Sequence, residues 1–202
     1  MSISASQVKE LREMSGVGMM ECKNALVETD GDIEKAMDLL RANSSLKAEK
    51  KASRVAADGE IKVVESKEFS CLIEINSETD FAAKDSKFKD FANDVAEYLL
   101  YNEVNNIDDL SKVFEEKRQS LIQSIGENIQ LRRLVTIEAP STGVIGAYLH
   151  SDGKLAALVS IDSKNIELAK DLAMHVSATN PSCLNPEDID TDLLEREKSI
   201  FK

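Results

Sequence analysis

Phe69-Ser70-Cys71-Leu72-Ile73-Glu74-Ile75 is a β-rich run that follows a similar run, residues 59–64, after the short polar break of residues 65–68. Two such runs on either side of a short polar break predict a β-hairpin. The second run leads at once into Ser77-Glu78-Thr79-Asp80-Phe81-Ala82-Ala83-Lys84, where a carboxylate stands beside an aromatic ring at the end of an element. The hairpin therefore starts a folded core, and the motif after it is the most informative candidate for function.

A long amphipathic helix is predicted after the motif. Its apolar residues have the i, i+3, i+4, i+7 spacing of a buried face; they are Phe88, Phe91, Ala92, Val95, Ala96 and Leu99. Residues 108–127 form a second helical pattern, and residues 129–138 alternate as a strand. The apolar positions of that second helix are Leu110, Val113, Phe114, Leu121, Ile122 and Ile125.

The order of hairpin and helix then recurs. Residues 143–149 and 155–161 are β-rich, a turn over residues 151–154 joins them, and another amphipathic helical pattern starts at Ile166. We therefore predict an α+β fold with a duplicated core, in which the first copy has three strands and the second has two.

The helical pattern of residues 190–202 shows neither a glycine cap nor a stop signal. We expect the chain to be cut within this helix, which leaves the second copy of the core incomplete. The missing part would leave an exposed sheet edge. The incomplete half could pair with a second copy of the chain, so a homodimer is one alternative.

Three short helices are predicted before the hairpin. The first covers residues 6–12 with Ser6 as its cap, and the second covers residues 19–27. Asp32 can cap the third helix, which is expected to end near Ser45; its apolar face consists of Ile33, Ala36, Met37 and Leu40.

Small modules of this kind usually work by presenting a surface. Met19 and Met20 open the second helix, and adjacent helical residues point about 100° apart, so one of them is expected to stay exposed. A flexible, polarizable methionine suits partner binding; an ordinary exposed hydrophobe is the alternative.

The length of 202 residues allows one or two domains of the usual ~100 to 200 residues. Residues 46–58 have no strong apolar stripe at first and are interpreted as a partly helical linker. We therefore place the N-terminal module with its linker at 1–54, the first core subdomain at 55–140 and the second at 141–202.

The formal net charge of −12 argues against a nucleic-acid binder, because binding to phosphate backbones depends on neutralisation by lysine and arginine. A short basic run within a helical pattern is interpreted as a solvated face; its members are Lys47, Lys50, Lys51 and Arg54.

The three cysteines are far apart and form no C-x-x-C pair, so neither a disulfide framework nor a zinc site is predicted. No run approaches the ~18 apolar residues of a membrane span, and we expect a cytoplasmic protein. The sequence has no complete phosphate-binding glycine motif, and its two histidines are far apart. We therefore expect no enzyme activity, metal or cofactor.

Several motifs resemble the elongation factor Ts family, the nucleotide exchange factors of the translational GTPase elongation factor Tu. They lie in the expected order along the entire chain, and Ala82 stands where the family more often has valine. The family usually continues past Lys202, and full affinity for the GTPase depends on that part. The matching stretches are residues 9–12, 18–26, 31–33, 79–84, 126–129, 132–133 and 173–176.

The resemblance implies that the chain promotes nucleotide exchange on elongation factor Tu without catalysing the making or breaking of a covalent bond. Phe81 would wedge between helices of the nucleotide domain of elongation factor Tu, while Thr79, Asp80 and Ala82 form the region that dislocates Mg²⁺ and the GDP phosphates. The implied further contacts with the same domain come from Arg12, Met19, Met20, Ile125, Gly126 and His150.

Two alternatives remain open at this stage. Phe81 lies seven residues before Phe88, so one continuous helix would place both in the core; a fresh helix start capped by Asp85 or Ser86 would separate them. The chain could also be a pure interaction module, in which the N-terminal three-helix unit, whose layout is similar to ubiquitin-associated domains, binds a partner without promoting exchange.

Overall fold

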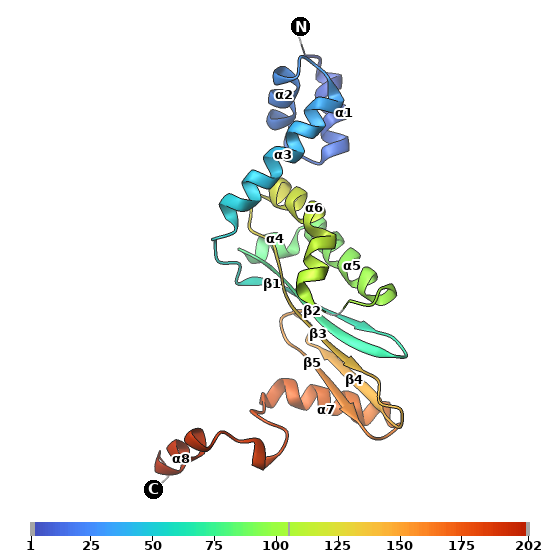
Figure 1. Ribbon diagram of the computed structural model, residues 1–202, viewed down its shortest axis with the longest axis vertical. Coiled ribbons are helices and arrows are strands. Elements are labelled where there is room, and N and C mark those ends of the chain that lie inside the picture. Colours follow the sequence, from blue (N-terminus) through green and yellow to red (C-terminus); the bar gives the residue numbers. More distant parts are fainter. Residues whose placement is uncertain (1–2, 105, 201–202) are drawn as a thin grey trace.

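The computed structural model describes residues 3–104 and 106–200. Figure 1 shows three parts in chain order: three N-terminal helices, a central sheet with helices, and a smaller C-terminal sheet with one helix against it. This is the predicted α+β fold, and the N-terminal helices lie at the opposite end of the molecule from the C-terminal helix α8 (Thr191–Ile200).

The N-terminal part consists of α1 (Ala5–Ser15), α2 (Met19–Glu28) and the start of α3 (Ile33–Lys51). Ser4, not the predicted Ser6, caps α1, because its side chain accepts from the amide of Gln7 while Gln7 accepts from the Ser4 amide. Such a capping box satisfies two orphan donors at once. Asp32 caps α3 as predicted. The buried core of this part is Val8, Leu11, Val17, Cys22, Ala25, Leu26, Ala36 and Leu40.

The predicted end of the third helix near Ser45 is wrong, and the helical part of the predicted, partly helical linker over residues 46–58 is the continuation of this helix. α3 continues unbroken to Lys51. Ser44 and Ala48 are buried one turn apart, and the helix packs against α6 (Ile107–Ile125). Tertiary burial of small residues on one face therefore extends a helix that lacks a strong apolar stripe.

The predicted hairpin is confirmed as β1 (Asp58–Glu65) and β2 (Phe69–Ser77), which pair antiparallel with Ile61 opposite Glu74. β3 (Gln130–Glu138) pairs antiparallel with the other edge of β2 and completes a sheet of order β1-β2-β3. Alternate residues of β2, among them Ile73 and Ile75, point into the core, as expected for a strand with period two.

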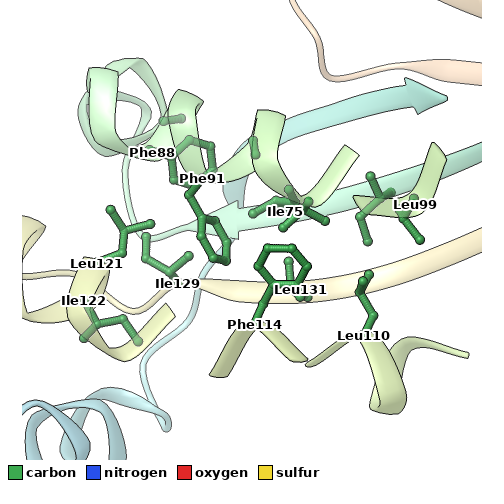
Figure 2. Close-up of a cluster of buried hydrophobic side chains, with 14 of the residues drawn as sticks. Ile75, Phe88, Phe91, Leu99, Leu110, Phe114, Leu121, Ile122, Ile129 and Leu131 are labelled. Carbon is green, nitrogen blue, oxygen red and sulfur yellow. The ribbon is translucent and has the colours of Figure 1, made fainter. Parts of the chain in front are cut away.

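Two helices cover this face of the sheet. α5 (Ser86–Tyr101) and α6 place their aromatic residues between them, and the rings of Phe91 and Phe114 meet edge to face with centroids 5.8 Å apart. Val113, predicted as apolar face, is instead 53% exposed. Figure 2 shows the cluster; its labelled members are Ile75, Phe88, Phe91, Leu99, Leu110, Phe114, Leu121, Ile122, Ile129 and Leu131.

The C-terminal part repeats the hairpin and helix on a smaller scale. β4 (Val144–Leu149) and β5 (Ala156–Ile161) form a separate antiparallel pair, and α7 (Ile166–Thr179) packs against both. The two predicted strands of the second copy are thus confirmed among the described residues. A short 3₁₀ turn, η1 (Pro186–Asp188), precedes α8.

Replacement of Gly146 in β4, even by alanine, is expected to lower the stability of the protein. A Cβ at this position would lie 2.1 Å from the carbonyl carbon of Ala169 in α7, so the helix backbone would have to move. We expect Gly146→Ala to destabilise the protein by about 1–3 kcal/mol, measured by urea denaturation. Gly18→Ala is the matched control, because a Cβ there meets nothing within 4 Å; equal losses in the two variants would contradict the packing argument.

The cysteine thiols are expected to differ sharply in reactivity. Burial raises the pKa of Cys71 to about 11, so only about one thiol in a thousand is ionised at pH 8, and Cys71 is 1% exposed. Cys183 is only partly buried. A thiol reagent at pH 8 should label Cys183 first and Cys71 only after unfolding in urea; equally fast labelling of both in the native protein would refute this.

Candidate partner-binding site

The motif at the end of β2 forms a short, separate helix, α4 (Asp80–Lys84). Thr79 caps it, because its hydroxyl accepts from the amide of Ala82 at 3.3 Å. The helix is anchored by Ala82 and Ala83, both buried. Asp85 caps α5 directly afterwards, so the chain has the fresh helix start that was one of the two alternatives.

Phe81 points away from the protein. Its exposed fraction is 80%, whereas Phe88 is fully buried, and the interpretation of Phe81 as a core residue is therefore wrong. Phe81 therefore presents an exposed apolar ring on a short helix whose alanines are buried.

Asp80 pairs with Lys84 one helical turn later, with 2.6 Å between Oδ2 and Nζ. Both side chains are substantially exposed, and exposed pairs of this kind contribute little to stability. The carboxylate beside Phe81 is thus free to exchange its partner at low cost.

The end of α6 meets the motif. Gly126 ends the helix in the left-handed conformation with φ of 90°, which favours glycine. The next residue, Glu127, accepts from the Thr79 amide at 2.9 Å and from the Thr79 hydroxyl at 2.6 Å. Ile125 and Gly126, both implied as partner contacts, directly precede Glu127 in the chain. Glu127 was not predicted, and no local pattern could reveal a contact across 48 residues of sequence.

A second set of hydrogen bonds fixes the base of the site. Glu78 accepts from the amide of Asn128 at 2.7 Å, and the Asn128 side chain donates to the carbonyl of Arg54 at 2.8 Å. Arg54 in turn reaches Glu78 at 3.4 Å. Asn128 is fully buried, so three segments distant in sequence are joined directly below α4.

The basic run in α3 is not simply a solvated face. Lys51 donates to the carbonyl of Gly126, and its pKa is lowered by partial burial and by the charge of Arg54. Lys47 pairs with Glu21 at 2.5 Å. Of the four predicted members, Lys50 and Arg54 are exposed, and Arg54 contacts Glu78.

The N-terminal helices are docked onto the same end of α6. Glu21 of α2 accepts from Gln123 at 3.0 Å. Partial burial favours the protonated form of Glu21, but hydrogen bonds from Lys47 and Gln123 outweigh it, and the pKa of Glu21 is lowered. The carbonyl of Gly16 accepts from Lys87 at 3.1 Å and from Ser124 at 3.3 Å.

The docked N-terminal helices carry three of the other implied partner contacts, Arg12, Met19 and Met20. Met19 and Met20 open α2 and are 52% and 66% exposed, so the expectation that they do not both face inward is confirmed, and both of them face solvent. The reason is that Gly18, one residue earlier, starts the helix at the edge of the module, and Cys22, Ala25 and Leu26 supply its buried face. Arg12 is also exposed, near the end of α1.

His150 lies on the turn between β4 and β5. This turn contacts β1, because the carbonyl of Gly153 accepts from Ile61 at 2.7 Å and Lys154 pairs with Asp58 at 2.7 Å. The pKa of Lys154 is raised by that bond to Asp58 and also by the charge of Asp80. His150 is exposed, and its Nδ1 meets the Tyr148 hydroxyl at 3.0 Å, so it is a turn residue on a hairpin near the motif.

The candidate site is a surface around α4 that is built from distant segments of the chain. Within the described residues, no three side chains of His, Cys, Asp or Glu are grouped to hold a metal ion. No helix in the described ranges is long and apolar enough to cross a membrane.

Comparison with known proteins gives a consistent result. The family described as elongation factor TS matches residues 78–202. Elongation factor Ts of Saccharophagus degradans is 49% identical over 205 residues, which cover 100% of this chain and 70% of the relative. Elongation factor Ts of Hahella chejuensis is 47% identical with the same coverage, and that of Haemophilus ducreyi is 48% identical over 98% of this chain and 68% of its own length.

The chain belongs to the elongation factor Ts family. The resemblance that the motifs carried is therefore confirmed, and the chain is a member of a family of translation elongation factors. The matched family region starts at Glu78, directly before the cap of α4. Ala82, which stands where the family more often has valine, is 4% exposed. The difference between alanine and valine therefore affects the packing under α4 and leaves the outer surface of the motif unchanged.

Proposed function

We propose that the chain is a guanine nucleotide exchange factor for elongation factor Tu and that it works without chemical catalysis of its own. The observation that carries this is the 80% exposed Phe81 on a helix held by buried alanines. In the proposed complex Phe81 inserts between helices of the nucleotide domain, and Asp80 with Thr79 disturbs the site of Mg²⁺ and the GDP phosphates. The cytoplasm, where translation takes place, is the proposed location.

The physical basis is linkage. A factor that binds the nucleotide-free GTPase more tightly than the GDP-bound form lowers the affinity for GDP by the same factor. Such differential affinity can come from a buried aromatic hot spot and needs no titratable group. The exposed Phe81 is the candidate for this hot spot.

The remaining implied residues extend the proposed contact. Met19 and Met20 are both exposed on a module fixed to α6 by Glu21, and His150 stands on the hairpin next to β1. A surface made of parts held by hydrogen bonds loses little conformational freedom on association. We assign Arg12, Ile125 and Gly126 to the same proposed surface.

The second candidate is an interaction module that binds through the N-terminal helices alone. Its support is the pair of exposed methionines. The two proposals differ in one equilibrium: the exchange factor binds nucleotide-free elongation factor Tu more tightly than the GDP·Mg²⁺ form, typically by 5- to 150-fold. Calorimetry of the chain against both forms tests this, and equal affinities would support the interaction module instead.

A further inference from the structure

The side chain of Glu127, which lies 48 residues further along the chain, binds directly to Thr79, the cap of α4. Its Oε2 accepts from the Thr79 amide at 2.9 Å and its Oε1 accepts from the Thr79 hydroxyl at 2.6 Å. We propose that Glu127 is a positioning residue that fixes α4 in the orientation in which Phe81 meets its partner. This inference rests on the proposed exchange function and adds a residue to which no role has been assigned above.

The chemistry of the contact suits a carboxylate. The Thr79 hydroxyl has one hydrogen to donate, which goes to Glu127, and its lone pair still accepts from the Ala82 amide at 3.3 Å. The Thr79 amide lies before the first turn of α4, where no helical carbonyl can serve it. One ionised carboxylate with two oxygens satisfies both donors at once, and hydrogen bonds to a charged acceptor are the stronger kind.

The carboxylate is itself held in place. Gly126 ends α6 with φ of 90°, which turns the chain towards Thr79 directly after the helix, and Lys51 donates to the Gly126 carbonyl. Asn128, the residue after Glu127, is fully buried and bonded to Glu78 and Arg54. The backbone that carries the Glu127 side chain is therefore held on both sides by hydrogen bonds.

The short helix needs such a contact. α4 has five residues, and isolated helices below ~12 residues are marginal in water. Phe81 contributes no anchoring, because it is 80% exposed. Without Glu127 the first turn of α4 would rely on the Thr79 cap and the two buried alanines, and the partner would have to order it on binding, at a cost in affinity.

Two readouts test the positioning role. In the free full chain, hydrogen exchange measured by NMR should show that Glu127→Ala lowers the protection of the Thr79 and Ala82 amides by about tenfold or more, while amides of α5 and α6 keep theirs. Glu127→Gln should be intermediate, because its amide oxygen can accept one of the two hydrogen bonds. Glu97→Ala, which removes the same charge from an exposed position of α5, should change neither.

Function gives the second readout. Release of labelled GDP from elongation factor Tu should slow by about tenfold with Glu127→Ala and by less with Glu127→Gln. In the Phe81→Ala background, Glu127→Ala should have little further effect, since residues that act through one another are not additive. A general loss of folding would instead lower protection throughout α5 and α6, which would overturn the positioning role.

The failures can be told apart. A wild-type chain that leaves GDP release unchanged would overturn the proposed function, and the positioning role with it. Normal wild-type activity combined with unaltered Thr79 protection, or with unaltered release in Glu127→Ala, would overturn the positioning role alone. Full additivity of the Glu127 and Phe81 effects would also refute it.

Discussion

Phe81→Ala is expected to lower the rate at which the chain promotes GDP release from elongation factor Tu by roughly 30-fold or more. The side chain is 80% exposed in the free chain, and a buried aromatic anchor in a complex typically contributes at least about 2 kcal/mol. The free energy of unfolding should stay within about 0.5 kcal/mol of wild type, since the ring makes no core contact. Stopped-flow release of labelled GDP gives the rate, and urea denaturation gives the stability.

Tyr101→Ala is the matched control for this variant. Tyr101 is another aromatic residue with a high exposed fraction, 75%, but it lies at the end of α5 that is far from the α4 junction. Its replacement should leave GDP release unchanged. If both variants slow release equally, the effect does not come from a wedge at Phe81.

Phe88→Ala is expected to destabilise the protein by about 3–5 kcal/mol. Phe88 is the largest of the fully buried side chains and belongs to the cluster between α5, α6 and the sheet (Figure 2). Its removal leaves a cavity that the packed neighbours can fill only in part. Urea denaturation followed by circular dichroism measures the loss.

The two phenylalanines form a matched pair, seven residues apart in the sequence. Phe81→Ala should lower the rate of GDP release and keep the stability of the protein, whereas Phe88→Ala should lower the stability. Phe88→Ala protein that is still folded at low temperature should retain GDP release, because α4 has its own cap and anchors. A small stability loss for Phe88→Ala together with a large one for Phe81→Ala would reverse the assignment of core and surface.

Local patterns predicted most of the elements because their causes are local. The hairpin of β1 and β2, the turn between β4 and β5 and the apolar face of α5 all follow from residues within a few positions of one another. Asp32 and Asp85 were recognisable as caps for the same reason. The motif itself stood out because an acid and an aromatic ring follow a strand without a break.

What the sequence could not predict depends on contacts between distant segments. α3 continues to Lys51 because its second half is buried against α6, which no pattern within α3 indicates. The bond from Thr79 to Glu127 spans 48 residues. Phe81 could be assigned to neither core nor surface by spacing alone, since the result depended on whether Asp85 starts a new helix.

The most direct test of the account is the release of labelled GDP from its Mg²⁺ complex with elongation factor Tu, followed with increasing amounts of the chain. The account predicts that the release rate rises with the concentration of the chain and levels off as the complex saturates. Formation of a stable complex with an unaltered release rate would contradict it.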